Sequence, residues 1–294
     1  MTNNQLIQNL MRKVKKFNKN RHIYFLLTTV QSIIFKLAFY FGFAKKGKFV
    51  EAKLFNGSKL IVKLPESVSE SIYRYGFFEE GLTYFLITHL KSGNVFFDIG
   101  AHFGYFTNIA SEIIGNVGSV HAFEPTPSTY ELLCLNSDKA NIITNRNAVF
   151  SSAKNITLND YGILNSSFNS IYHGRLGGNV KQKIYSKKFE VSTITIDQYV
   201  IDKGVIPNLI KIDAENAEYE ILLGMKNTIV NYKPIITLEV GDKNAAGAIS
   251  SRKLIDYMID NNYQPFYYKN MDFIKLTLLS ENYEYDNLFF IPLS

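Results

Sequence analysis

The pattern of apolar and polar positions predicts a series of buried strands separated by helices. The apolar run Val95-Phe-Phe97 ends in Asp98, and after Gly104 apolar side chains recur at helical spacings of three and four. Further runs of strand length lie at 119–123, 144–150, 209–212, 233–239, 264–268 and 287–292. We therefore expect an α/β fold of three layers, with a seven-stranded, mostly parallel sheet between two layers of helices.

Two segments precede this alternating pattern. Residues 49–64 contain two alternating runs around Asn56-Gly57, a pair favoured in type I′ turns, and they predict a β-hairpin. Residues 1–44 form a helical arm with a basic run, Arg12–Arg21, followed by an apolar stretch, 23–44, that contains Lys36. We expect the remaining residues, 45–294, to form one catalytic domain.

Three interpretations of the arm stay open. Its helices could pack on the catalytic domain, or its basic amphipathic part could lie on an anionic membrane surface. The apolar stretch is nearly long enough to span a bilayer, but Lys36 would be costly in hydrocarbon. No secretory signal is convincing, because the arm lacks a small-residue cleavage site.

Charge and cysteine content narrow the functional classes. The 294 residues carry a formal charge of +6, and residues 1–50 contain ten Lys or Arg and no Asp or Glu. The basic character therefore belongs to the arm, and no recognition module for nucleic acid accompanies it. The single cysteine, Cys134, fits a reducing compartment. We expect a cytoplasmic protein, with peripheral contact to the inner face of the membrane as an option.

The turn after the first strand carries the strongest chemical signal. Gly100 and Gly104 are spaced Gly-x-x-x-Gly, and Asp98 stands two residues before them. A carboxylate there would repel a pyrophosphate but suits a ligand with an amine and a sulfonium. Glu124, at the end of the second strand, is placed to accept hydrogen bonds from ribose hydroxyls. Together these residues favour S-adenosylmethionine (SAM) over NAD, which stays the alternative.

A second acidic landmark follows the strand at 209–212. Asp213 comes directly after this strand and should face the same crevice as Asp98, where it could accept a proton from a substrate hydroxyl. Glu215 and Glu218 are either helix-start acids or parts of the site. These acids could also bind a divalent metal, but no histidine accompanies them, so no metal site is predicted.

Residues 151–190 interrupt the alternating pattern. They are rich in Asn, Ser and Gly, which predicts a β-rich insertion or a lid over the site. His173 lies within this segment and is a second candidate base, although a lone loop histidine is more often simply solvated.

Six segments of the chain resemble the FkbM family of SAM-dependent methyltransferases in sequence, order and spacing. They are Gly76-Phe-Phe-Glu79, Phe97-Asp-Ile-Gly-Ala-His-Phe-Gly-Tyr-Phe106, Ala122-Phe-Glu-Pro-Thr-Pro127, Val191-Ser-Thr-Ile-Thr-Ile-Asp197, Ile210-Lys-Ile-Asp-Ala-Glu-Asn-Ala-Glu218 and Pro234-Ile-Ile-Thr-Leu-Glu239. The resemblance implies a Rossmann-like class I methyltransferase that transfers a methyl group from SAM to a hydroxyl of a sugar, a glycan or a related secondary metabolite. In one departure, Asn216 occupies the family's glycine position in Asp-x-Glu-Gly-x-Glu. Asparagine tolerates positive φ best among the other residues, so the turn should survive.

The pattern and the resemblance together give a set of candidate site residues. Asp213 and His173 are the candidate catalytic residues. The predicted cofactor-binding residues are Glu79, Asp98, Gly100, Ala101, His102, Gly104, Tyr105, Glu124, Pro125, Asn147, Ala148 and Asp213. Two other functions remain open: an inactive methyltransferase-like module in polysaccharide assembly, and a nicotinamide-dependent oxidoreductase, which Asp98 and the absent third glycine disfavour.

Overall fold

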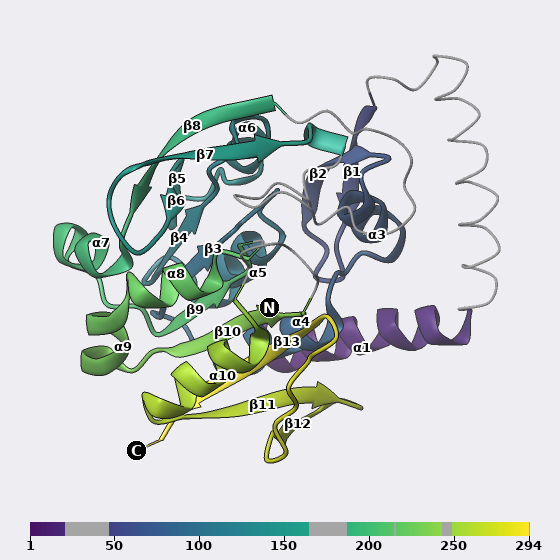
Figure 1. The fold of residues 1–294 in the computed structure, drawn as a ribbon. Helices are drawn as coiled ribbons and strands as arrows, with labels where there is room; N and C mark the ends of the chain where they lie inside the picture. Colours follow the sequence, from purple (N-terminus) through teal and green to yellow (C-terminus); the bar gives the residue numbers. More distant parts are fainter. Residues whose placement is uncertain (21–46, 165–186, 215, 243–248, 294) are drawn as a thin grey trace.

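A computed structural model describes residues 1–20, 47–164, 187–214, 216–242 and 249–293 (Figure 1). Its central sheet has eight strands in the order β12-β11-β13-β10-β9-β3-β4-β5. Within it, β10, β9, β3, β4 and β5 run parallel to one another. The other three pairs, β10 with β13, β13 with β11 and β11 with β12, are antiparallel. The parallel strands are β3 (Val95–Ile99), β4 (Ser119–Phe123), β5 (Ile142–Asn145), β9 (Leu209–Ile212) and β10 (Ile235–Val240).

The predicted α/β fold is confirmed, with two differences in the strands. The sheet has eight strands and not seven, because the chain reverses after β11 (Tyr263–Lys269) and pairs back as β12 (Asp272–Lys275). Asn270 and Met271 make this reversal with positive φ angles of 52° and 67°. The strand predicted at 144–150 is split: β5 ends at Asn145, and β6 (Ala148–Val149) joins a second sheet, β6-β8-β7. The last strand of the central sheet is β13 (Asp286–Pro292).

Helices cover both faces of the central sheet. One apolar core lies against α3 (Ser67–Tyr75), α4 (Glu80–His89) and α5 (Tyr105–Ile114). The other contains side chains of α7 (Ile196–Lys203), α8 (Glu218–Leu223), α9 (Lys226–Tyr232) and α10 (Ser251–Asp260). The two layers bury the apolar strands on both sides, as parallel sheets require. Helix α6 (Pro127–Asn136) follows β4.

The predicted hairpin consists of β1 (Lys48–Lys53) and β2 (Lys59–Leu64). Asn136, at the end of α6, ties it to the turn that follows β3. Its Nδ2 donates to the carbonyl oxygens of Ile61 and Phe103, each at 2.9 Å, and its Oδ1 accepts from the Ile61 backbone N at 2.8 Å. The hairpin is therefore held against the edge of the candidate site.

The first helix, α1 (Asn3–Lys19), packs on the domain and lies at the right of it in Figure 1. Its buried side chains belong to the same core as those of α4, and Asn3 Nδ2 donates to the Ile87 carbonyl at 2.8 Å. Apolar contact with α4 thus occupies the apolar face of α1. Residues 21–46, which include the predicted apolar stretch, lie outside the described residues. Within the described part of the chain, no helix combines the length and the apolar character that a membrane span needs.

The insertion predicted at 151–190 begins with β7 (Asn155–Asp160) and reaches β8 (Lys187–Ile194), with which β7 pairs antiparallel. The intervening residues 165–186, with His173, lie outside the described residues. The prediction of a lid therefore stays a prediction.

Candidate functional site

A cavity lies at the carboxyl ends of the parallel strands, where ligands bind in open α/β sheets. Ten of the twelve predicted cofactor-binding residues line it. They are Glu79, Gly100, Ala101, His102, Tyr105, Glu124, Pro125, Asn147, Ala148 and Asp213. Asp98 and Gly104 do not line the cavity: Gly104 begins α5, and Asp98 is fully buried behind the lining. The fold therefore gathers residues from five separate segments around one cavity.

The turn after β3 depends on close backbone packing. Gly100 has a φ of 75°, and a Cβ placed on it would overlap the carbonyl oxygen of Asp213. The backbone N atoms of Gly100 and Ala101 both donate to the Phe123 carbonyl at 3.0 Å. These contacts hold the ends of β3, β4 and β9 together at the floor of the cavity. Only glycine satisfies both the positive φ and the close approach.

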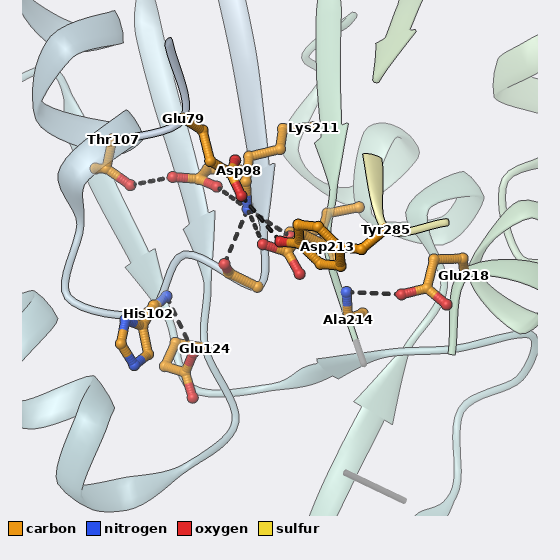
Figure 2. Close-up of polar contacts among 12 residues, drawn as sticks. Glu79, Asp98, His102, Thr107, Glu124, Lys211, Asp213, Ala214, Glu218 and Tyr285 are labelled. Atoms are coloured by element: carbon orange, nitrogen blue, oxygen red, sulfur yellow. Dashed lines mark hydrogen bonds and ion pairs between the residues drawn. The ribbon is translucent and has the colours of Figure 1, made fainter. Parts of the chain in front are cut away.

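The side chain of Glu124, the residue that follows β4, contacts the turn after β3. Its Oε2 accepts a hydrogen bond from His102 N at 3.1 Å (Figure 2). Its Oε1 accepts one from Thr126 N at 2.9 Å. Burial raises the pKa of Glu124 to about 7, although these hydrogen bonds oppose the shift. The carboxylate is therefore held in one orientation beside the cavity, with acceptor capacity left for hydroxyl groups.

Lys211 stands at the centre of the charged residues in Figure 2. Its side chain is 2% exposed, and its Nζ lies 3.3 Å from Asp98 Oδ1 and 3.5 Å from Asp213 Oδ2. Nζ also donates to the Gly100 carbonyl at 3.0 Å. Asp98 additionally accepts a hydrogen bond of 2.6 Å from Thr107 Oγ1. One buried cation therefore joins the acid before the glycine turn to the acid after β9.

Glu79 approaches the same cavity from the start of α4. Its φ of 41° lies in the left-handed region, and Tyr105 Oη accepts a 3.1 Å hydrogen bond from the preceding Phe78 N. Tyr285 Oη donates to Glu79 Oε1 at 3.0 Å, and the Asn287 side chain also lowers the pKa of this carboxyl group. Oε2 is buried and has no hydrogen bond of ordinary geometry from the described residues. Burial, followed by the charge of Asp213, raises the pKa of Glu79 to about 7. A ligand amine would supply the missing partner of Oε2.

The turn after Asp213 is organised by Glu218, the first residue of α8. Its Oε1 accepts hydrogen bonds from Ala214 N at 3.0 Å and Asn216 N at 3.2 Å, so it supports the loop and does not line the cavity. Asn216 has a φ of 79°, as expected for a residue at the glycine position of this turn. Among the described residues no cluster of three or more His, Cys, Asp or Glu side chains could hold a metal ion. Glu215 lies outside the described residues.

The sequence reasoning did not assign four charged or polar lining residues to the site: Thr126, Lys211, Glu239 and Tyr285. Lys211 did leave a signal, because a lysine inside the apolar run Leu-Ile-Lys-Ile must be paired if the strand is buried. Glu239 lies one residue before the end of β10, and acids directly follow β4 and β9, so the same argument could have included it. No sequence signal marks Tyr285, which reaches the cavity only through the tertiary fold.

Comparison with known proteins identifies the family of the chain. The model of the methyltransferase FkbM domain matches residues 98–265, which is more than half of the chain. This chain belongs to the FkbM methyltransferase family. The matched segment begins at Asp98 and contains Glu124, Lys211 and Asp213. Membership places the chain among the methyltransferases.

Similar proteins include the hexuronic acid methyltransferase AglP of Haloferax volcanii, which is 28% identical over 184 residues, or 60% of this chain and 70% of AglP. Among solved structures, methyltransferase FkbM from Methylobacillus flagellatus is 14% identical with a TM-score of 0.41, covering 68% of this chain. This FkbM-family chain spans only 43% of the length of that protein. Aeropyrum pernix fibrillarin, solved with natively bound SAM, is 10% identical with a TM-score of 0.42, covering 83% of this chain and all of the fibrillarin chain.

Proposed function

We propose that this FkbM-family protein is a SAM-dependent O-methyltransferase that acts on a hydroxyl group of a sugar, a glycan or a related metabolite. The observation that carries the proposal is the placement of Glu124 and Glu79 at separate parts of one cavity. Glu124 is oriented to accept hydrogen bonds from ribose hydroxyls, and Glu79 has a buried oxygen without a partner among the described residues, suited to an amine. A ligand with a nucleoside at one end and an amino acid at the other would satisfy both acceptors.

Each part of the cavity would have its own task. Asn147 and Ala148 would contact the adenine, beside the ribose at Glu124, while the glycine turn lets the backbone approach the ligand. Near Asp213 the lining also includes Glu239 and Tyr285, so we place the acceptor hydroxyl there. When bound, the cofactor supplies a methyl group that is already activated on a sulfonium.

The protein's part in the reaction would be mainly orientation. The residues around Asp213 would hold the acceptor oxygen in line with the methyl group and exclude water, and such positioning can account for much of the rate acceleration. Asp213 is 26% exposed, so it can reach an acceptor, and we assign to it the proton that the hydroxyl loses. The second candidate base, His173, lies outside the described residues and stays a prediction.

The acceptor class rests on a sequence relative. AglP, to which the chain is 28% identical, is named as a hexuronic acid methyltransferase, which supports a sugar acceptor. The test is a screen of mono- and oligosaccharides, uronic acids included, for a mass increase of one methyl group in the presence of SAM. A protein that binds SAM but methylates no sugar would overturn the acceptor class and leave the cofactor assignment intact.

The cofactor is tested by calorimetric titration with S-adenosylhomocysteine and, in parallel, with NAD. We expect binding of the former, lost in Glu124→Ala, and none of NAD. Glu131→Ala, at an exposed acid on α6, is the matched control that should bind as the wild type does. Absence of binding to either compound would favour the inactive module, and binding to NAD alone would contradict the site assignment.

For the arm, helix α1, which is the part of it that the structure describes, supports an electrostatic form of membrane contact. The apolar face of α1 is buried, while Arg12, Lys15, Lys16 and Lys19 are exposed. We infer that these side chains contact anionic lipid headgroups. Replacing them with Glu should abolish sedimentation with phosphatidylserine vesicles. If the replacement leaves sedimentation unchanged, this inference is wrong.

A further inference from the structure

We propose that the acceptor of this protein is an amino sugar whose ammonium group is bound by Glu239, and that the cavity disfavours sugars bearing a carboxylate. Since it concerns the acceptor end of the same cavity, this assignment rests on the proposed function. It also separates the chain from AglP, which is named for a hexuronic acid.

The described side chains that line the cavity carry mostly negative charge. Four of them are carboxylic acids, whereas Lys211 is the only lysine or arginine among the described lining residues. The pKa of two of these acids, Glu79 and Glu124, is raised to about 7 by burial, so both are mostly ionised at pH 8. His102 adds no positive charge there, because burial lowers the pKa of its imidazole. The other two acids are Asp213 and Glu239.

The one lining lysine is already engaged by groups of the protein. Lys211 is 2% exposed, and its Nζ lies 3.3 Å from Asp98 Oδ1 and 3.5 Å from Asp213 Oδ2. Nζ also donates to the Gly100 carbonyl at 3.0 Å. An ammonium has three donor hydrogens, and these three partners use them. A carboxylate on the acceptor would therefore meet the acids of the lining without a described cation to pair with, and like charges brought together in a site disfavour binding.

Glu239 lies at the end of the cavity away from the nucleoside. Leu238 in β10 is the Cα partner of Ile212 in β9, so Glu239 and Asp213 directly follow paired residues and stand level at the strand ends. In the sheet order β10-β9-β3-β4, Glu239 is three strand spacings, or about 14 Å, from the end of β4, where Glu124 is assigned to the ribose. Glu239 therefore stands beside the proposed base, on the side where we place the acceptor.

Tyr285 connects Glu239 with Glu79. Its Oη donates to Glu79 Oε1 at 3.0 Å, and its hydrogen bond with Glu239 is one of the causes that raise the pKa of Tyr285. A phenol has a single proton, so at any instant one of the two carboxylates has lone pairs that this proton does not use. Glu239 is only 5% exposed, and a buried carboxylate is stabilised best by a charged partner. An ammonium group that enters the cavity would provide this partner for Glu239, as the cofactor amine would for Glu79.

The competing explanation is that Glu239 assists Glu79 in binding the cofactor amine. The two roles differ in what the loss of the Glu239 charge does. If Glu239 serves the acceptor, Glu239→Gln changes the choice among acceptors at saturating SAM. If it serves the cofactor, the same change weakens the binding of S-adenosylhomocysteine and leaves the choice among acceptors as it was.

The first experiment measures kcat/KM for methyl transfer at pH 8 with saturating SAM and four matched methyl glycosides. They are those of glucose, of its 2-amino and 6-amino derivatives, and of glucuronic acid. The better amino sugar should exceed glucose, and it should exceed glucuronic acid by at least about tenfold, because only the charge near Glu239 differs strongly among them. Equal values, or a preference for glucuronic acid, would overturn the proposal.

The second experiment repeats these measurements with Glu239→Gln, which keeps the size of the side chain and removes its charge. The preference for the amino sugar over glucose should fall by about tenfold, while calorimetry should find the affinity for S-adenosylhomocysteine nearly unchanged. Glu131→Gln, at an exposed acid on α6, is the matched control and should keep the wild-type preference. An unchanged preference in Glu239→Gln would refute the role of this residue. Should Glu239→Gln not fold, the ranking of the sugars by the wild type still decides the charge preference.

Failure of the proposed function gives a different result. If glucuronic acid is methylated as well as the amino sugars are, the methyltransferase assignment stands and the amino-sugar assignment is wrong. If no sugar is methylated, the proposed acceptor reaction is wrong for these compounds, and saturation-transfer NMR of the same glycosides with the protein and S-adenosylhomocysteine ranks their binding directly. Binding of an amino sugar but not of glucuronic acid would support the charge preference, and any other order would overturn it.

Discussion

The hydroxyl of Tyr285 donates a 3.0 Å hydrogen bond to the carboxylate of Glu79, which lies 206 residues earlier in the chain. The bond joins the segment before β13 to the residue that precedes α4. It also lowers the pKa of Glu79, against the effects of burial and of Asp213. Tyr285 therefore helps to orient and ionise the carboxylate that we assign to the cofactor amine.

Replacing Tyr285 with Phe should weaken SAM binding by roughly tenfold. A hydrogen bond to a charged group contributes about 1.5 kcal/mol, and 1.4 kcal/mol corresponds to a factor of ten in affinity. The matched control is Tyr268→Phe, which removes a similar bond, of 2.5 Å, to the neighbouring Glu80 outside the cavity lining. Calorimetric titration of both variants is the measurement, and equal losses in the two would refute a specific role of Tyr285.

The affinity for SAM should rise between pH 6 and pH 8. Burial raises the pKa of both Glu79 and Glu124 to about 7, so each carboxyl group gains its charge within this range. A cationic ligand binds the ionised form better, and we expect up to about a tenfold change per pH unit below pH 7 for each linked proton. Glu79→Gln should flatten the profile in calorimetry, whereas Glu131→Gln should leave it unchanged. A wild-type profile without slope would argue against both assignments.

The unliganded protein should show the opposite dependence. Because the folded-state pKa values of Glu79 and Glu124 lie above the ordinary value, folding favours their protonated forms. Their contribution to stability is complete below the ordinary carboxyl pKa and is lost as the pH rises through about 7. Thermal unfolding without ligand should therefore occur at lower temperature at pH 8 than at pH 6, and this difference should shrink in Glu79→Gln.

Gly100→Ala should destabilise the protein by about 3 kcal/mol or more, because the new Cβ would overlap the Asp213 carbonyl and the residue would keep a positive φ. Gly204→Ala separates the two effects. Gly204 also has a positive φ, of 63°, but nothing lies within 4 Å of its added Cβ, so the cost should be only about 1 kcal/mol. Urea unfolding of the two variants gives the comparison, and similar losses would mean that the turn can relax.

Asn216→Gly should keep or slightly increase stability, whereas Asn216→Ala should lose about 1 kcal/mol. The reason is the φ of 79°, which glycine adopts freely and alanine does not. Asn262, which follows α10 with a φ of 65°, is the matched position away from the cavity and should respond in the same way. If Asn216→Gly instead lowers SAM affinity while Asn262→Gly does not, the asparagine side chain has a role in the site.

Much of the fold and part of the site were determined by the sequence itself. The apolar runs predicted β3, β4, β9 and β10, because strands that are buried on both faces of a sheet are apolar along their length. The acids and glycines at the ends of these strands then predicted where the cavity lies, since the ends of parallel strands meet at one edge. Asn216 was correctly expected to hold the turn, because positive φ is a local property of the residue.

Only the tertiary structure decided how the charges are arranged. The position of Asp98 behind the cavity lining depends on the pairing of Lys211 with it across two strands more than a hundred residues apart. The contact of Tyr285 with Glu79 depends on the last antiparallel strands folding back on the sheet, and no local pattern encodes that. The extra strand β12 likewise arose from a reversal at Asn270 and Met271. Local propensity and the pattern of apolar residues can be read directly from the sequence. The balance of charge in a buried site instead depends on which distant residues the fold brings into contact.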